Sequence, residues 1–277
     1  MIDERRRFRP EPRVGEVLAI QPQALEFSYL WAGFPCNERT ANNIAVVTIM
    51  GPLEHHATAE WDSYESILER LEDAMRGTDM PRLTALLAGD DVMGPAIKPR
   101  AVVLKIDSPG GEAAGATFAH RQMLKLRKKY NIPLYAYANE MAASAAYELA
   151  CACDEIWLPD TGTVGSIGVI ATLYDRTKYN KMTGLAIELV TSGTRKADNH
   201  ADRELTDDIR KRVQGRVEQL ANVFWSVVAK SRGCSVEAIA ELEASVFIGQ
   251  DAVDVGIADG ISNWFEFLSL ISSSIEG

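Results

Sequence analysis

One serine stands among small residues in a stretch that could supply a nucleophile. The stretch Asn139-Glu-Met-Ala-Ala-Ser-Ala-Ala-Tyr147 places Ser144 between two pairs of alanines, where a predicted strand passes into a helix. The alanines leave space beside the hydroxyl for a substrate carbonyl, and a helix N-terminus favours developing negative charge. The same residues also fit a serine that caps an alanine-rich buried helix. This stretch alone leaves both interpretations open.

A serine nucleophile needs a general base, and Lys196 in Thr191-Ser-Gly-Thr-Arg-Lys-Ala-Asp198 is the candidate. A lysine accepts a proton only as an uncharged amine, so its pKa has to fall from about 10.4 to roughly 7–8. A fall of about three units corresponds to roughly 4 kcal/mol and requires a desolvated pocket. Ser166, in Thr163-Val-Gly-Ser-Ile-Gly-Val169, has a hydroxyl that could orient the amine. Taken separately, Lys196 is better explained as a solvated lysine beside Arg195.

Backbone N–H groups near these side chains could bind a developing oxyanion. The turn Asp107-Ser-Pro-Gly-Gly111 follows a predicted strand, and its paired glycines leave N–H groups unshielded. We expect the N–H groups of Gly111 and Ala145 to form this oxyanion hole. The substrate-binding groove would be lined by neighbouring residues, namely Gly110, Met141 and Gly165. Pro-Gly-Gly is also ordinary turn chemistry, in which Asp107 is a loop acid that caps the turn.

Strands and helices alternate along the chain and have to position these loops. Apolar, β-branched runs predict strands at 44–50, 101–107, 134–138 and 155–158. Helical periodicity or capping predicts helices at 64–75, from the 108–111 turn to about 129, at 143–153 and at 206–232, the last capped by Thr206. This order indicates an α/β fold with a mostly parallel sheet covered by helices. Its active site is expected at the carboxyl ends of the strands.

Composition and charge narrow the classes of function. The chain is 47% hydrophobic and 25% charged, which is ordinary for a globular protein, and its formal net charge of -10 argues against nucleic acid as a partner. We see no apolar stretch of about 18 residues and no secretory signal, and therefore expect no stable membrane insertion and a cytoplasmic location. The four cysteines lack the spacing of a zinc site, so we expect no metal.

In combination, the loops resemble the signal peptide peptidase A family of Ser-Lys serine peptidases, in particular the short, soluble phage or prophage type that includes head-maturation proteases. The resemblance covers roughly residues 44–261, and Ser144, Ser166 and Lys196 follow one another at separations of 22 and 30 residues that suit the family. The matching stretches lie at 107–111, 141–147, 164–169, 192–198 and 247–260.

The resemblance implies a Clp/crotonase-like fold that assembles into a ring or dome of identical subunits. It also implies that Ser144 is the nucleophile, Lys196 the general base and Ser166 the residue that holds the lysine. Gly111 and Ala145 would be the oxyanion donors. The substrate would be a peptide or unfolded protein, cleaved through an acyl-enzyme intermediate without a cofactor.

We expect residues 44–268 to form the peptidase domain, with an irregular insertion at 77–99. Residues 1–43, which contain four prolines, would be an N-terminal arm or cap, and 269–277 a C-terminal tail.

Two other functions fit the same fold. A crotonase-like acyl-CoA hydratase or isomerase also uses two backbone N–H groups as an oxyanion hole, and would take Glu112 and Glu140 as its acids. A non-catalytic capsid assembly or scaffold protein could retain the fold without the chemistry. The intact set of Ser144, Ser166 and Lys196 favours the peptidase.

Overall fold

The computed structural model describes residues 17–20, 37–40, 42–56, 61–77 and 97–275. The chain divides into two compact units. The large unit comprises Ala19–Val169 and Leu220–Gly277, and the small unit comprises Met1–Leu18 and Ile170–Gln219. The predicted insertion at 77–99 and the predicted arm at 1–43 lie mostly outside the described residues.

The large unit is built on an eight-stranded sheet with the order β12-β10-β8-β6-β3-β2, to which β9 and β13 are joined through β8. Its strands are β2 (Asn37–Arg39), β3 (Ile44–Met50), β6 (Ala101–Ser108), β8 (Leu134–Ala143), β9 (Glu155–Leu158), β10 (Thr163–Gly165), β12 (Val246–Ile248) and β13 (Gly260–Ile261). Among the described strand pairs of this sheet, only β2–β3 and β10–β12 are antiparallel. The predicted α/β fold with a mostly parallel sheet is therefore confirmed.

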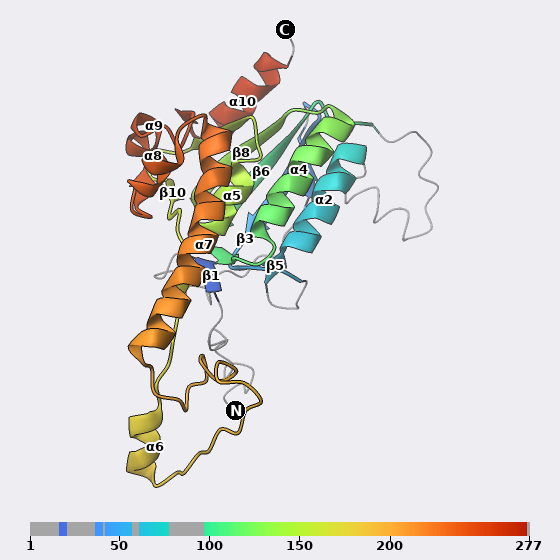
Figure 1. The fold of residues 1–277 in the computed structure, drawn as a ribbon. Helices are drawn as coiled ribbons and strands as arrows, with labels where there is room; N and C mark the ends of the chain where they lie inside the picture. The colour runs from blue at the N-terminus through green and yellow to red at the C-terminus, as the bar shows by residue number, and fades with distance from the viewer. Residues whose placement is uncertain (1–16, 21–36, 41, 57–60, 78–96, 276–277) are drawn as a thin grey trace, which may run out of the picture. The chain divides into compact units, whose positions relative to one another are not determined.

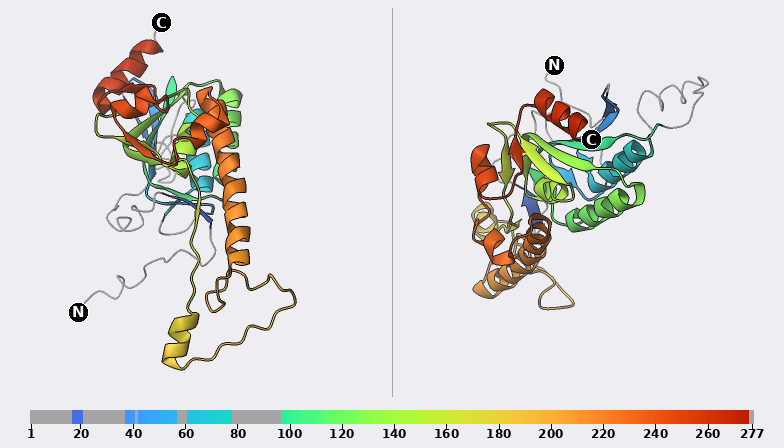
Figure 2. Two further views of the ribbon diagram at one scale, coloured as in Figure 1. Left: turned by 60° about the vertical axis from the view of Figure 1, so that its left-hand side comes forward. Right: turned by 90° about the horizontal axis from the view of Figure 1, so that it is seen from above.

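Helices cover both faces of this sheet. Those of the large unit are α2 (Tyr64–Arg76), α4 (Ala116–Tyr130), α5 (Ala145–Ala150), α8 (Val236–Ala240), α9 (Gln250–Asp254) and α10 (Trp264–Ser274), and α7 (Asp207–Arg232) enters it from the small unit. Helices α2 and α4 lie side by side on one face (Figure 1). Helix α10 lies on the other, as the view from above shows (Figure 2).

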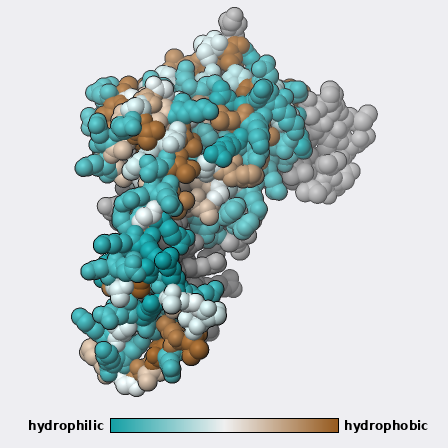
Figure 3. Space-filling model, in the orientation of Figure 1, coloured by the Kyte–Doolittle hydropathy of each residue, from teal (hydrophilic) through white to brown (hydrophobic). Residues whose placement is uncertain are grey.

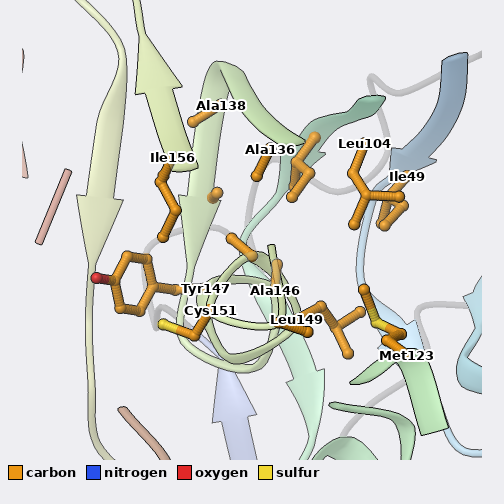
Figure 4. Close-up of a cluster of buried hydrophobic side chains, with 14 of the residues drawn as sticks. Ile49, Leu104, Met123, Ala136, Ala138, Ala146, Tyr147, Leu149, Cys151 and Ile156 are labelled. Atoms are coloured by element: carbon orange, nitrogen blue, oxygen red, sulfur yellow. The ribbon is translucent and has the colours of Figure 1, made fainter. Parts of the chain in front are cut away.

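The side chains of β6 point alternately to the two faces of the sheet, and each face has its own hydrophobic cluster. Leu104 and Ile106 point into the larger hydrophobic cluster, together with Met123 of α4 and Leu149 of α5 (Figure 4). Ala101 and Val103 point to the opposite face, where they meet Phe267 and Ile271 of α10. Successive side chains of a strand point to opposite faces, so a strand buried on both reads as a continuous apolar run. This is why the run at 101–106 predicts a buried strand.

Three short parallel strands lie beside the main sheet in the large unit: β4 (Leu53–Glu54), β5 (Asp62–Ser63) and β7 (Gly110–Glu112). β4 pairs with both of the others, and the pair β4–β7 places Leu53 opposite Gly111. The turn after β6 is therefore held by strand pairing.

The small unit contains α6 (Thr177–Thr183), the strand β11 (Ile170–Ala171) and the first half of α7. β11 pairs antiparallel with the start of β1 (Val17–Ile20). Several large apolar side chains are exposed in this unit, and brown residues are visible around α6 in Figure 3. The exposed large apolar side chains of this unit include Tyr179, Met182, Leu185 and Val190.

Some predicted boundaries are accurate and others shift. The strands at 44–50 and 155–158 have the predicted bounds, and α7 starts after Thr206, whose Oγ1 accepts a hydrogen bond from Ile209 N at 3.3 Å. The helix predicted at 143–153 is shorter, because β8 continues to Ala143 before α5 begins. Helix α10 runs through the predicted boundary at 268. Across the described residues, no helix combines the length and apolarity that a bilayer span needs.

The buried hydroxyl of Tyr147 links α5 to the segment before β13. It donates a hydrogen bond of 2.7 Å to the carbonyl oxygen of Ile257. We expect Tyr147→Phe to lower the free energy of unfolding by about 1–3 kcal/mol, because the variant leaves a buried carbonyl without its donor. Urea denaturation measures this. The matched variant Tyr179→Phe removes a hydroxyl from a residue that is 64% exposed and should change stability by less than about 0.5 kcal/mol. Equal effects of the two substitutions would contradict this account.

Candidate active site

Three parallel strands deliver the predicted site loops of the large unit to one edge of the sheet. β8 lies between β6 and β10, with Ser108 opposite Ala142 and Gly165 opposite Ala143. Ser144 and Ser166 come directly after β8 and β10, and β7 with Gly110 and Gly111 begins two residues after Ser108 of β6. Because parallel strands end at the same edge, these three segments come together there. Met141 lies at the same level, opposite both Asp107 and Thr163.

The backbone of Ser144 is in a conformation that only glycine adopts readily, with φ 53° and ψ −122°. It occupies the N-cap position of α5, but its side chain accepts no hydrogen bond from the helix. The alternative interpretation is therefore correct about the position of Ser144, but the side chain does not cap the helix. Its hydroxyl lies 3.5 Å from the carbonyl oxygen of Gly168, at the outer limit of a hydrogen bond. A serine held in strain without a capping role is typical of a functional site.

Backbone hydrogen bonds hold Ser144 on both sides. Its N–H donates to the carbonyl oxygen of Gly165 at 2.8 Å, and its own carbonyl accepts from Glu148 N at 3.0 Å. The first bond links the serine to β10 and the second to α5. The surrounding structure thus fixes the strained conformation from two directions.

Ser166 also has a positive φ, of 53°, and is 7% exposed. Its N–H donates to the carbonyl oxygen of Ser245 at 2.8 Å, just before β12. Gly165 has φ 119°, and a Cβ there would lie 2.5 Å from the same Ser245 oxygen. Strand β12 therefore packs so closely that position 165 requires glycine. Directly after Ser166, the carbonyl oxygen of Ile167 accepts a hydrogen bond of 2.9 Å from Trp225 Nε1 of α7.

The predicted oxyanion donors occupy a tightly packed turn and a helix start. A Cβ on Gly111 would lie 1.8 Å from the carbonyl oxygen of Leu53, so this position also requires glycine. Gly110 has φ 97°, and its N–H donates to Ser108 Oγ at 3.2 Å. Ala145 is buried and is the first residue of α5, where backbone N–H groups have no partner within the helix. The roles of Gly111 and Ala145 stay predictions.

Lys196 belongs to the small unit, where it is exposed. Its backbone N–H donates to Gly193 O at 3.1 Å in a turn. Two residues later, Asp198 forms ion pairs with Arg203 at 2.9 Å and with Arg212 of α7 at 2.7 Å. These pairs anchor the segment that carries the lysine to the start of α7. Ser144 and Lys196 lie in different units, and their meeting stays a prediction.

A buried acid behind Ser144 was not anticipated from the sequence. Glu148 is 2% exposed, and its Oε1 accepts a hydrogen bond of 2.6 Å from Thr117 Oγ1 of α4. Burial raises the pKa of Glu148 to about 7, although Thr117 and Arg121 act in the opposite direction. His120 Nδ1 lies 2.8 Å from the carbonyl oxygen of Glu148, and burial lowers the pKa of this histidine. A charged residue one turn after Ser144 in an alanine-rich run is the signal that could have revealed this cluster.

The two glutamates of the acyl-CoA alternative have other surroundings. Glu112 Oε2 accepts a hydrogen bond from His55 N at 2.9 Å, and Glu140 is exposed. Among the described residues, no group of three or more His, Cys, Asp or Glu side chains could hold a metal ion.

Comparison with known proteins identifies one matching protein family and several relatives. Residues 126–273, just over half of the chain, match the model of peptidase family S49. The head-tail preconnector protein GP5 of Enterobacteria phage P21 is 31% identical over 242 residues, which cover 86% of this chain and 44% of that protein. The capsid assembly protease C of Escherichia phage lambda is 28% identical over 240 residues, 85% of this chain and 50% of the relative.

A cellular relative matches a shorter part of the chain. The putative signal peptide peptidase SppA of Enterococcus faecium is 29% identical over 163 residues, 58% of this chain and 47% of that protein. The chain thus spans about half the length of these relatives.

The strain at Ser144 can be measured by comparing two substitutions. Both Ser144→Ala and Ser144→Gly remove the hydroxyl, but only glycine relieves the positive φ. Strain of about 1–3 kcal/mol outweighs the entropic cost of glycine, about 0.5–1 kcal/mol. We therefore expect Ser144→Gly to be more stable than Ser144→Ala by about 1 kcal/mol in urea denaturation. A glycine variant less stable than the alanine variant would show that the serine is unstrained.

The raised pKa of Glu148 predicts a pH-dependent stability. A carboxyl that holds its proton more tightly when folded stabilises the protein fully below its ordinary pKa of 4.5, and this contribution is lost as the pH rises through about 7. Glu148→Gln keeps the shape and does not titrate. Between pH 4.5 and 8 we expect the wild type to lose up to roughly 3 kcal/mol of unfolding free energy relative to this variant. Parallel pH profiles of the two proteins would contradict the burial of an ionisable acid.

Proposed function

Because the chain belongs to peptidase family S49, we propose that it is a serine endopeptidase with Ser144 as nucleophile and Lys196 as general base. The observation that carries this proposal is the backbone of Ser144, which is strained, held from two sides and not used to cap α5. Substitution by glycine would relieve that strain, so the presence of a hydroxyl at this position calls for a role of its own.

In the proposed reaction the uncharged amine of Lys196 takes the proton of the Ser144 hydroxyl, and the oxygen attacks the scissile carbonyl. The N–H groups of Gly111 and Ala145 receive the negative charge that develops on the carbonyl oxygen. Lys196 then passes its proton to the leaving amine, and water releases the acyl-enzyme by the same route. Ser166 holds the lysine in place.

This chemistry sets a condition on Lys196. An exposed ammonium is a poor base at neutral pH, so the amine has to lose water before it can act. In its own unit the residue is exposed. We propose that the neutral amine forms only where substrate, the large unit or a neighbouring subunit covers this segment.

The substrate is proposed to be a peptide or an unfolded protein that binds along Gly110, Met141 and Gly165. Two of the relatives carry names from phage head assembly, and on that ground we propose a capsid or scaffold protein as the substrate. A homo-oligomer acting in the cytoplasm completes the proposal. The exposed apolar residues of the small unit, such as Met182 and Val190, support an assembly that covers them.

The central test compares variants on an unfolded protein and on an acyl-peptide reporter. We expect Ser144→Ala and Lys196→Ala each to lower kcat/KM by roughly 10³-fold or more, because each removes a group that takes part in bond cleavage.

The matched control is Arg195→Ala, which removes the neighbouring exposed cation and should keep at least about half of the activity. Circular dichroism and the size of the assembly should be the same for all four proteins. Equal turnover by the wild type and by the Ser144 and Lys196 variants would rule out the mechanism.

A further inference from the structure

A bulge interrupts β8 just before the residues that lead to Ser144. Ile106 of β6 lies opposite Ala138, but the next residue, Asp107, lies opposite Met141. Asn139 and Glu140 are therefore extra residues on the β8 side. Such a bulge sets how far the rest of a strand is advanced relative to its neighbour.

Side chains from both neighbouring strands hold this bulge. From β6, Asp107 Oδ1 accepts a hydrogen bond from Glu140 N at 2.6 Å, and Oδ2 accepts one from Asn139 Nδ2 at 2.9 Å. From β10, Thr163 Oγ1 donates to the carbonyl oxygen of Glu140 at 3.1 Å. The peptide groups on both sides of Glu140 are thus fixed, and the carboxylate bonds are of the charge-assisted, stronger kind.

The sequence suggested a different task for Asp107, namely capping the turn that follows it. In the structure Ser108 takes that task, because its Oγ accepts from Gly110 N and donates to Gly51 O at 2.7 Å. The carboxylate of Asp107 instead points back to β8. Burial raises the pKa of Asp107, whereas the two hydrogen bonds from the bulge favour its charged form.

We propose that Asp107 is a positioning residue of the peptidase site, whose carboxylate fixes the bulge at Asn139 and Glu140 and thereby the register at which β8 delivers Ser144. The inference rests on the proposed role of Ser144 as nucleophile. Asp107 acts through the backbone. Three residues separate the bulge from the serine, and over that distance β8 is held between Ser108 and Gly165 by strand pairing. A shift in the bulge is therefore transmitted to the serine and to its bond with Gly165 O.

A swap of the two partners tests this proposal. In Asp107→Asn both charge-assisted bonds become neutral, and the Asn139 amide has to turn over before its oxygen can accept from the new NH₂. The bulge is then held more weakly, and we expect kcat to fall roughly 10-fold with KM within about twofold. Asn139→Asp alone places two carboxylates together and should also lower kcat. The double variant Asp107→Asn/Asn139→Asp restores a charge-assisted bond between the two positions and should return kcat to within about threefold of the wild type.

Hydrogen exchange of the intact assembly gives a second readout that needs no turnover. Peptic fragments that span residues 139–147 should exchange faster in Asp107→Asn, and at the wild-type rate in the double variant and in Ser144→Ala. Wild-type kcat or wild-type exchange in Asp107→Asn would overturn the proposal, as would a double variant that recovers neither quantity. If the wild type cleaves no substrate, the peptidase proposal fails, and exchange alone decides whether Asp107 fixes the position of Ser144.

Discussion

The register between three parallel strands is the constraint on which the site depends. β8 pairs with β6 on one side and β10 on the other, and Ser144 follows directly where these pairings end. A residue with φ 53° and ψ −122° would relax if it were free. It cannot relax because its N–H is bonded to β10 and its carbonyl to α5. The strain is thus maintained by hydrogen bonds that belong to the sheet and helix rather than to the serine side chain.

Close contact between backbone segments is the second constraint on the site. At Gly111 and Gly165 a side chain would collide with a carbonyl oxygen of a neighbouring segment, of Leu53 and Ser245 respectively. Gly165 lies in β10, which pairs with β8, and Gly111 lies in β7, which follows β6 on the other side of β8. Where backbones approach so closely, the shape of the site is set by main-chain atoms, and main-chain N–H groups are the donors that an oxyanion requires. The proposed chemistry uses donors of this kind.

The sequence predicts helices and strands well where a whole segment is uniformly buried. It predicts them poorly where pairing between distant strands decides the conformation. The strand at 44–50 could be placed to the residue because a β-branched run ends at Gly51-Pro52, and α7 because Thr206 and the acids after it mark a helix start. The residues from 141 to 143 are all apolar, so no period separates strand from helix there. No local sequence pattern predicts the bulge at 139–140, because register is a property of two paired strands.

The structure specifies Ser144 more completely than it specifies Lys196. Ser144 is specified by its own unit, through strain, strand pairing and the helix that follows it. Lys196 is specified only by its place in an anchored turn, since the ion pairs of Asp198 fix the chain while the amine stays exposed. A serine can be prepared by geometry, but a lysine becomes a base only when water is removed from it. In the proposed enzyme, the structure of the large unit therefore holds Ser144 ready for attack at all times. Lys196 becomes a base only when another surface covers its segment and removes water from the amine. Catalysis would then be limited to this covered state.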